Sequence, residues 1–300
     1  MVCLGCRART ERGRELYTVS RVGDELVCDH CGRRYPIVDE VAIVAGDVEA
    51  HRAKWGAELV DGEPEALAEH LSIYLDAHWS DRAAPVEEWG MAAAAHKLAE
   101  RAAEPVERAV ELGCGPGRGL HELAKGAREV VGVDAQLAVL RRARRILDGE
   151  AVEYGRRVVG RHYATARIAS PPTANVTLVC GEAMDPPLVP QSFDRVVALN
   201  LLDAVPYPLQ ILAVVDGLCA PGGEVILSAP YAWQSSIVAD EHRFGGADPG
   251  ADLRRRLVEG DGLEARYAIE DDCDVPWTLR RDARSAVVYR VHWLRARKSR

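Results

Sequence analysis

Four glycines alternate with other residues in the stretch AVELGCGPGRGL, which spans positions 109–120. An apolar run ending in Glu111 precedes them, and the next apolar run along the chain ends in Asp134. A strand, a glycine-rich turn and a helix N-terminus form a site in which backbone approaches a nucleotide-like ligand closely. A carboxylate at the end of the second strand suits a ribose, because its two hydroxyls are hydrogen-bond donors. The sequence therefore predicts a ligand held between the glycine loop, Glu111 and Asp134.

The order of the glycines disfavours two common nucleotide sites. The dinucleotide fingerprint GxGxxG requires glycine or alanine at its last position, where this chain has Arg118 or Leu120, depending on which glycine starts the pattern. The P-loop requires a lysine followed by serine or threonine, and the stretch contains neither. Because a carboxylate beside the loop repels a pyrophosphate, Glu111 favours a cationic ligand instead.

Two cysteine pairs form the second group of residues that could do chemistry. Cys3 and Cys6, and likewise Cys28 and Cys31, place two thiols on one tight turn, and two such turns can close a tetrahedral cage around zinc. Four protein ligands leave no open position, so this metal would be structural. Disulfides or free thiols are the alternatives to a metal site. His30 is either a replacement ligand or a surface histidine.

The elements that position these residues follow from hydrophobic periodicity. Strand and helix patterns alternate from residue 105 onwards, which is typical of a parallel sheet covered by helices on both faces. The expected strands are 106–112, 128–134, 176–183, 193–202, 223–231, 263–270 and 285–298, with helices that include 121–127 and 136–147. The last two strands are expected to form an antiparallel edge. The predicted fold class is α/β, with a doubly wound, mostly parallel sheet.

The remaining segments suggest how the chain is divided. The predicted parts are a zinc-ribbon-like segment at 1–48, a helical segment at 49–104 and the α/β domain at 105–300. Within the first part a β-hairpin is expected to turn at Gly23 and bring the two cysteine pairs together. The helical segment is predicted to contain one helix that starts at Glu63-Pro64-Glu65 and a second from Trp89 to Ala103. Residues 146–176 exceed the length of an ordinary connection and are predicted to form an inserted β-hairpin.

Composition narrows the class of protein. The chain has 300 residues, 48% of them hydrophobic, and a net charge of −8. This acidic balance argues against a nucleic-acid substrate, because phosphate contacts need a basic surface. The sequence has no apolar run long enough to cross a bilayer, and its start, MVCLGC, is unlike a signal peptide, so a cytoplasmic protein is expected. No oligomeric state is predicted.

Four motifs in consecutive order resemble those of class I S-adenosylmethionine-dependent methyltransferases over about residues 105–230: VELGCGPG, VVGVD, VCGEAMDPPLVPQSFDRVVALNLLDAV and APGGEVILSAPY. The resemblance implies a seven-stranded Rossmann-like sheet with S-adenosylmethionine as the cofactor. The cofactor-binding residues that it implies are Glu111, Gly113, Cys114, Gly115, Gly117, Asp134, Ala135, Glu182, Ala183, Asn200 and Leu201. Among them, Glu111 would lie near the methionine ammonium, Asp134 would accept the ribose hydroxyls, and Glu182 would receive the adenine.

The N-terminal stretch CDHCGRRYPIVDEVAIV resembles the zinc-ribbon family that includes the small activator subunit of tRNA and rRNA methyltransferases. The match covers about the first 46 residues, and Glu40 stands where that family often has glycine. This resemblance implies a structural zinc ion held by Cys3, Cys6, Cys28 and Cys31.

Polar aromatic side chains gather in the segments expected to enclose the methyl acceptor. They are Tyr74, His78 and Trp79 before the glycine loop, Tyr207 after the fourth strand, Tyr231 and Trp233 after the fifth, and Trp277 with Arg280 between the last two. His78 and Tyr231 are the predicted catalytic residues, and the others are predicted to contact the substrate. Packing in the core is the alternative for His78, Trp233 and Trp277.

The pattern SAPYAW, FGG and DVPWTLRRDAR resembles methyltransferases that act on histidine-derived imidazoles, such as the ovothiol-pathway domain and, more distantly, carnosine N-methyltransferases. It implies methyl transfer to a nitrogen of a small amine or imidazole metabolite. The first alternative is an rRNA or tRNA methyltransferase, in which the arginines at 141–145 contact RNA; otherwise they form a solvated helix face. The second alternative is a binding or scaffold protein that keeps the fold without the chemistry.

Overall fold

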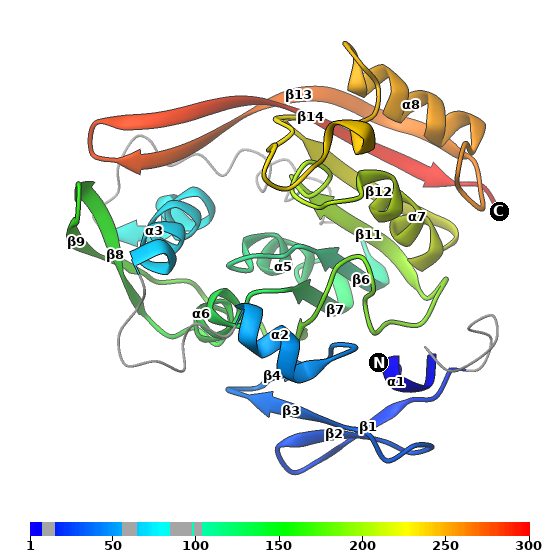
Figure 1. Cartoon of the computed structure of the whole chain (residues 1–300), viewed down its shortest axis with the longest axis horizontal. Helices are drawn as coiled ribbons and strands as arrows, with labels where there is room; N and C mark the ends of the chain where they lie inside the picture. The colour runs from blue at the N-terminus through cyan, green and yellow to red at the C-terminus, as the bar shows by residue number, and fades with distance from the viewer. Residues whose placement is uncertain (8–15, 56–64, 85–97, 99–103) are drawn as a thin grey trace.

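The computed structural model describes residues 1–7, 16–55, 65–84, 98 and 104–300. The helix expected from Trp89 to Ala103 lies outside the described residues, except for Leu98. The described strands form one large sheet and one small sheet (Figure 1). Among the helices that the structure describes, none combines the length and the apolar character needed to span a membrane.

Seven strands of the large sheet make the predicted doubly wound core. They are β6 (Val106–Leu112), β7 (Ala127–Asp134), β10 (Val176–Cys180), β11 (Phe193–Leu199), β12 (Cys219–Ala229), β13 (Tyr267–Asp282) and β14 (Ser285–Lys298). Their order across the sheet is β10-β7-β6-β11-β12-β14-β13. All neighbours are parallel except β14, which is antiparallel to both β12 and β13. The predicted mostly parallel, Rossmann-like sheet with an antiparallel edge is confirmed.

Helices cover both faces of this sheet. Side chains of consecutive strand residues point to opposite faces, so neighbouring residues of one strand pack against different helices. Val196 of β11 packs in the cluster that contains Leu212 from α7, whereas Val197 packs in the cluster that contains Leu140 from α6. The helices after residue 104 are α5 (Arg118–Leu123), α6 (Leu137–Leu147), α7 (Pro208–Leu218), the 3-10 turn η3 (Asp240–His242) and α8 (Pro249–Glu259).

The N-terminal segment continues the same sheet instead of standing apart from it. Its elements are α1 (Leu4–Arg7), β1 (Val19–Val22), β2 (Glu25–Cys28), β3 (Arg34–Val38), β4 (Val41–Ile43) and α2 (Val48–Trp55). The expected hairpin turns at Gly23, whose φ is +62°. Strand β4 pairs in parallel with β10, placing Ala42 opposite Val179, so the ribbon strands extend the core sheet at its β10 edge (Figure 1).

Two hairpins project beyond the core and meet near α3 (Glu65–Trp79). Residues 146–176 contain the expected β-hairpin, formed by β8 (Val152–Val159) and β9 (His162–Ile168), and β9 also pairs with the short β5 (Ala83–Ala84) that follows the turn η2 (Ser80–Arg82). The long β13–β14 hairpin extends over α3 in Figure 1, and its Ala283 amide donates to the Val158 carbonyl (3.1 Å).

Strand β13 runs much further than the predicted strand over 263–270. The stretch DVPWTLR, expected between two strands, lies within it. Pro276 is tolerated there because β13 is the edge strand of the sheet and Pro276 need not donate to a further neighbour. The extension carries Trp277 outwards from the core sheet towards α3.

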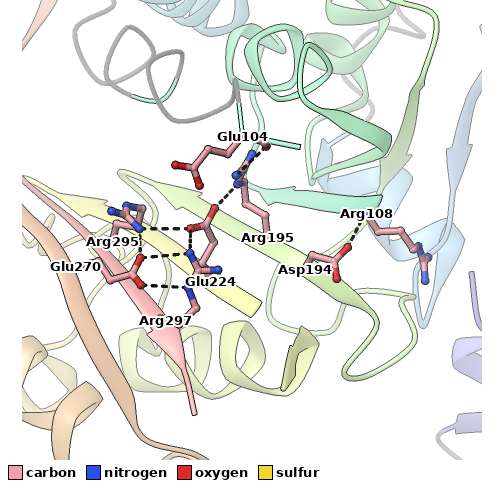
Figure 2. A network of polar contacts seen from close by, with 8 residues as sticks. All are labelled: Glu104, Arg108, Asp194, Arg195, Glu224, Glu270, Arg295 and Arg297. Atoms are coloured by element: carbon pink, nitrogen blue, oxygen red, sulfur yellow. Dashed lines mark hydrogen bonds and ion pairs between the residues drawn. The ribbon is translucent and has the colours of Figure 1, made fainter. Parts of the chain in front are cut away.

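A buried polar network joins β11, β12 and β14 near the start of the parallel strands (Figure 2). Arg195 Nε donates to Glu224 Oε1 at 2.5 Å, and both side chains are at most 2% exposed. The second carboxylate oxygen of Glu224 lies 3.2 Å from Arg297 and 3.6 Å from Arg295. These charges are paired away from the strand ends where the candidate site lies.

Candidate cofactor and acceptor site

A cavity of about 550 Å³ opens at the carboxyl ends of the parallel strands. Glu111 near the end of β6, Asp134 at the end of β7, Asn200 just after β11 and Pro230 just after β12 all line it. In open α/β sheets, ligands bind in the crevice outside these strand ends. The position of the cavity is therefore the one that the fold class predicts for a ligand.

The glycine loop is folded tightly against the first two strands. Gly113 and Gly115 have φ angles of +70° and +50°, a conformation that other residues adopt only with strain. The backbone amide of Gly115 donates to Asp134 Oδ2 at 3.0 Å. Gly119 leaves room for the acidic residue of β6, because a Cβ there would meet the Glu111 carboxylate at 2.3 Å. The loop and its two carboxylates thus form one compact unit.

Glu111 presents a carboxyl group that suits a positive ligand. Its side chain is buried, and its Oε2 atom has no hydrogen-bond partner among the described residues. Burial and, to a smaller extent, the nearby Asp134 raise the pKa of Glu111 to about 8, against the opposing effect of the backbone amide of Leu120. A buried carboxyl with an unpaired oxygen gains most from an ammonium group, which would restore its ionised form.

Asp134 is held ready to accept from a ligand. Its Oδ1 accepts from the Gln136 amide at 2.9 Å while its Oδ2 accepts from Gly115. Burial raises the pKa of Asp134, and these backbone amides act in the opposite direction. Each carboxylate oxygen can accept more than one hydrogen bond, so two hydroxyl donors such as those of a ribose can be added.

Most of the residues predicted to bind the cofactor line this cavity. Those that do are Glu111, Gly113, Gly115, Asp134, Ala135, Glu182, Ala183, Asn200 and Leu201. Cys114 and Gly117 are not among its lining residues. Cys114 is buried beneath the loop, against Gly132 of β7, and Gly117 is the left-handed N-cap of α5 with φ +83°. These two positions shape the loop from behind.

The other end of the cavity is enclosed by aromatic and polar side chains. Tyr74 and His78 of α3 line it together with Trp277 of β13 and Tyr289 of β14. The ring centroids of Trp277 and Tyr289 lie 5.8 Å apart. Asp203, which follows β11, completes the wall. Burial raises the pKa of Tyr74, and Tyr289, Asp203 and Asp134 add to this shift. The Tyr74 hydroxyl therefore lies near both the Asp134 carboxylate and the aromatic wall.

Two histidines in this chamber are held in the neutral form. Burial and, to a smaller extent, the charges of Arg118 and His70 lower the pKa of His78 to about 4. Burial also lowers the pKa of His70, whose ring stacks on Tyr74 with centroids 4.3 Å apart. His78 reaches the glycine loop, since a Cβ built on Gly115 would lie 3.6 Å from its ring. A neutral imidazole at this position can accept a proton at physiological pH.

Sequence reasoning missed His70, Tyr289, Asp203 and Lys54, all of which line the cavity. A signal for His70 existed, because it lies four residues before Tyr74 and eight before His78, on the same helical face. Asp203 follows the end of the fourth predicted strand by a few residues. Tyr289 and Lys54 had no such signal, since only the tertiary structure brings β14 and α2 to the cavity.

Five predicted substrate or catalytic residues do not line the cavity, and the expectation that they form its walls is corrected. They are Trp79, Tyr207, Tyr231, Trp233 and Arg280. Trp79 is fully buried and its indole donates to the Pro116 carbonyl (2.9 Å), so it supports the glycine loop from behind.

The other four are turned elsewhere by their own contacts. Tyr207 is 48% exposed and rests on His242. The Tyr231 hydroxyl bonds to His292 Nδ1 at 2.8 Å, and Trp233 packs on Tyr231 and Phe244. Arg280 is buried within β13.

The cysteine pairs meet in the N-terminal segment as predicted. The sulfur atoms of Cys3, Cys6, Cys28 and Cys31 all lie within 4.8 Å of one another. Cys3 Sγ is 3.7 Å from Cys31 Sγ, and Cys6 Sγ is 3.7 Å from Cys28 Sγ. A tetrahedral zinc site with bonds of about 2.3 Å has sulfur–sulfur edges of about 3.8 Å. Two of the sulfur–sulfur distances match that edge, and the four cysteines form a group that could hold a metal ion.

Comparisons with known families agree with both parts of the chain. Residues 110–227 match the family described as "Methyltransferase domain", and residues 1–40 match "Trm112p-like protein". These matches fall on the glycine loop with its following strands and on the cysteine segment, respectively.

Curated relatives are similar over the same core. The chain is 27% identical over 157 residues to a ubiquinone biosynthesis O-methyltransferase of Idiomarina loihiensis, covering 51% of this chain and 56% of that protein. It is 28% identical over 184 residues to the protein of the same name from Hahella chejuensis, covering 59% and 68%. The chain therefore spans little more than half the length of the first of these relatives.

Two solved structures are similar to this chain at low sequence identity. A putative methyltransferase of Bacillus halodurans is 15% identical, with a TM-score of 0.48 over 69% of this chain and 99% of that one. A complex of the Haloferax volcanii Trm112 methyltransferase activator with a putative methyltransferase gives 16% identity, a TM-score of 0.49, and coverages of 78% and 95%. Residues 110–227 therefore match a methyltransferase domain and have the Rossmann-like fold of class I S-adenosylmethionine-dependent methyltransferases, and they follow a Trm112-like match over residues 1–40.

Proposed function

We propose that this protein transfers a methyl group from S-adenosylmethionine to a small molecule. The unit formed by Gly115, Asp134 and the unpaired carboxyl oxygen of Glu111 carries this proposal, because it offers hydroxyl acceptors and an ammonium partner side by side. S-adenosylmethionine, when bound, supplies a methyl group on a sulfonium centre for in-line displacement. The chain's own residues then hold the cofactor, orient the acceptor and exclude water.

Each end of the cavity has a separate task in this proposal. Glu111 binds the methionine ammonium and Asp134 binds the ribose, while Glu182 and Ala183 enclose the adenine. Asn200 and Leu201 lie at the end of the fourth parallel strand, close to the reacting centre. The chamber made by Tyr74, Trp277, Tyr289 and Asp203 receives the acceptor.

We favour a hydroxyl group as the methyl acceptor. A hydroxyl must lose its proton as the new bond forms, and neutral His78 is a base placed over the glycine loop. The neighbouring rings of Trp277 and Tyr289, which are tilted by 33° with centroids 5.8 Å apart, give the cavity an aromatic wall on which a flat acceptor can pack. The similarity to O-methyltransferases supports the same choice.

Transfer to a nitrogen is the second candidate. The buried carboxyl of Asp203 beside the aromatic wall can orient an amine, and an amine nitrogen attacks without a strong base. The curated relatives give no support to a histidine-derived acceptor, so an amine of another kind is the form of this candidate that we keep.

RNA is the less favoured acceptor. The arginines on α6 are engaged with acidic neighbours: Arg141 pairs with Asp39, Arg144 with Asp148 and Arg145 with Glu150. Together with the net charge of −8, this leaves little basic surface on that helix for phosphate contacts.

For the N-terminal segment, we propose that the four cysteines hold a structural zinc ion.

The proposal is tested in two steps. Calorimetry with S-adenosylmethionine and S-adenosylhomocysteine should show one site per chain; binding of neither ligand would leave only a scaffold role. Methyl-labelled cofactor is then incubated with phenols and catechols, amines and imidazoles, thiols, and RNA. We expect label on a hydroxyl compound. Label on an amine alone would favour the second candidate, and label on RNA alone would contradict a small-molecule acceptor.

A further inference from the structure

The segment of residues 230–237, which follows β12 and which we call the strap, has one face towards the cavity and one face away from it. Pro230 and Ala232 line the cavity, whereas Tyr231 and Trp233, which alternate with them, do not. Because the two faces alternate residue by residue, the contacts that hold Tyr231 and Trp233 also determine where the cavity face of the strap lies.

The backbone of the strap is unusual at both of these aromatic residues. The φ angles of Tyr231 and Trp233 are +53° and +40°, in the left-handed region that residues with a side chain rarely occupy. Such a conformation persists only where the surrounding contacts determine it. The path of the strap therefore depends on what these two side chains touch.

A chain of hydrogen bonds fixes the Tyr231 side chain. Its hydroxyl lies 2.8 Å from His292 Nδ1, and His292 Nε2 lies 2.9 Å from Asp272 Oδ1. An ionised carboxylate can only accept, so Nε2 carries the proton, and Nδ1 of the neutral ring accepts from the Tyr231 hydroxyl. The other oxygen of Asp272 accepts from Arg254 of α8 at 3.1 Å. The chain of bonds thus joins the strap to β14, β13 and α8.

Two further features hold the same side of the strap. His292 is only 8% exposed, and a Cβ at Gly250 of α8 would lie 3.3 Å from its Nδ1, so the glycine leaves room for the ring. Phe244 packs edge-on against both Tyr231 and Trp233, with centroid distances of 6.2 Å and 5.3 Å. The face of the strap away from the cavity is therefore held by polar and aromatic contacts together.

The other face of the strap holds Asp203. The amide of Ala232, which lies between the two left-handed residues, donates to Asp203 Oδ2 at 2.8 Å. Asp203 lines the cavity and is 3% exposed. Burial raises its pKa, and the two groups that oppose this shift are the backbone amides of Ala232 and of Asp203 itself. A cation in the cavity would oppose the shift further, because it favours the ionised carboxylate.

The surroundings of Asp203 suit a positively charged group on a flat molecule. Trp277 and Tyr289 line the same end of the cavity, and the charge of Asp203 contributes to the raised pKa of Tyr74, so these two groups are neighbours. The faces of aromatic rings attract ammonium groups. Because Glu111 is the proposed partner of the cofactor ammonium, Asp203 remains for the acceptor.

We propose that Asp203 selects an aromatic acceptor that carries a protonated amine, and that the strap holds Asp203 in place for this contact. Tyr231, His292 and Asp272 act through the strap as positioning residues and do not touch the acceptor. The inference rests on the proposed methyl transfer to a hydroxyl group and adds the charge of the acceptor. Without the Tyr231–His292 bond the strap can leave its left-handed conformation, which moves the Ala232 amide away from Asp203.

The first test measures the binding of two probes to the full-length protein saturated with S-adenosylhomocysteine. Tyramine and 4-ethylphenol share a phenol ring with a two-carbon chain, and only tyramine carries an ammonium group. Calorimetry should show that the unmodified protein binds tyramine about tenfold more tightly than 4-ethylphenol. Asp203→Asn should reduce this preference to less than about twofold, while S-adenosylhomocysteine affinity also stays within about twofold of the unmodified protein.

The second test addresses the positioning residues. Tyr231→Phe and His292→Ala should each lower the preference for tyramine to about threefold or less, because Asp203 is held less firmly. His292→Gln offers an acceptor and a donor in one side chain and should recover part of the preference. Tyr267→Phe is the matched control, because it also removes a buried hydroxyl, which donates to Asp216 at 2.8 Å, but Tyr267 does not line the cavity. It should leave the preference unchanged.

Hydrogen exchange supplies a readout that needs no probe. The Ala232 amide should exchange faster in Tyr231→Phe and His292→Ala than in the unmodified protein, while the amides of the glycine loop 113–119 should keep their rates. Faster exchange throughout the chain would instead show a general loss of stability and would contradict a positioning role.

The outcomes separate this inference from the proposed function. If the unmodified protein binds no S-adenosylhomocysteine, the proposed function fails, and this inference fails with it. If it binds S-adenosylhomocysteine but does not prefer tyramine, only the inference is overturned. The inference is also overturned if Asp203→Asn keeps the preference, or if Tyr231→Phe and His292→Ala change it no more than Tyr267→Phe does. A loss of S-adenosylhomocysteine affinity in Asp203→Asn would overturn it too, because Asp203 would then serve the cofactor.

Discussion

The amide of Gly115 donates to the carboxylate of Asp134 across 3.0 Å, joining the glycine loop after the first core strand to the end of the second. Through this bond the same carboxylate shapes the loop and lines the cavity. A change at Asp134 should therefore alter both the proposed ribose contact and the loop conformation.

Asp134→Asn should weaken S-adenosylhomocysteine binding by about a hundredfold, because one carboxylate oxygen is replaced by an amide donor facing a backbone N–H. Calorimetry measures the change. Asp148→Asn, which alters only an exposed pair with Arg144, is the control and should leave affinity unchanged. Equal affinities for the two variants would show that Asp134 does not bind the ligand.

The raised pKa of Glu111, about 8, predicts a pH-dependent affinity. Below that pH the unliganded carboxyl is protonated, and an ammonium ligand favours its ionised form, so binding releases a proton. Affinity for S-adenosylhomocysteine should therefore rise with pH and level off above about 8. Calorimetry in buffers of different ionisation enthalpy measures the proton. In Glu111→Gln, binding should no longer release this proton, and the rise of affinity with pH that depends on Glu111 should disappear. An unchanged dependence of affinity on pH would contradict the role of Glu111.

The Glu111 carboxyl also affects the free energy of unfolding of the ligand-free protein. Between its ordinary pKa of 4.5 and the folded value of about 8, the unfolded chain has released the Glu111 proton while the folded protein retains it. The contribution of Glu111 to the free energy of unfolding is thus largest at low pH and falls as pH rises through this range. Urea titrations at pH 5 and pH 8 measure this effect. The free energy of unfolding of the unmodified protein, relative to that of Glu111→Gln, should be lower at pH 8 than at pH 5.

If His78 is the base for a hydroxyl acceptor, His78→Gln should lower kcat about a hundredfold or more while S-adenosylhomocysteine affinity changes little. Because the pKa of His78 is about 4, the rate of the unmodified protein should show no loss of this base until the pH falls towards 5. Steady-state kinetics with an acceptor found in the panel measures both. A normal kcat in His78→Gln would show that His78 lines the cavity without acting as the base.

Trp277→Leu should raise KM for an aromatic acceptor about tenfold, because the aromatic wall that Trp277 forms with Tyr289 loses one of its two rings. Cofactor affinity should stay the same, since Trp277 belongs to the acceptor end of the cavity. Tyr207→Leu is the control, because Tyr207 rests on His242 outside the cavity. If Trp277→Leu weakened cofactor binding and acceptor binding equally, the role of Trp277 would be to pack the fold and not to contact the acceptor.

Glu224→Ala should destabilise the fold by about 3–5 kcal/mol, because it leaves the buried guanidinium of Arg195 without its carboxylate (Figure 2). Urea unfolding measures this change. Glu107→Ala breaks an ion pair with Arg128 in which both side chains are more than 70% exposed, and it should cost less than about 1 kcal/mol. Similar losses in the two variants would show that burial of the pair does not matter.

The sequence by itself determined the features that depend on residues close together in the chain. The glycine loop, Glu111 and Asp134 could be assigned because strand, turn and helix start follow one another directly, and the cofactor end of the cavity is built almost wholly from such strand ends. The two CxxC turns were equally local. The inserted hairpin and the antiparallel edge followed from alternation and length.

The aromatic side chains that line the cavity, and the segments that contact the loop after β10, could be identified only from the three-dimensional packing of the chain. Tyr231 and Trp277 both follow predicted strands, yet packing turns Tyr231 onto His292 and Trp277 into the cavity. The edge position of β13 let a proline-containing stretch continue as a strand, and the ribbon reached Glu182 through His51. Side-chain direction in these places depends on contacts between segments far apart in the chain, which local periodicity does not encode.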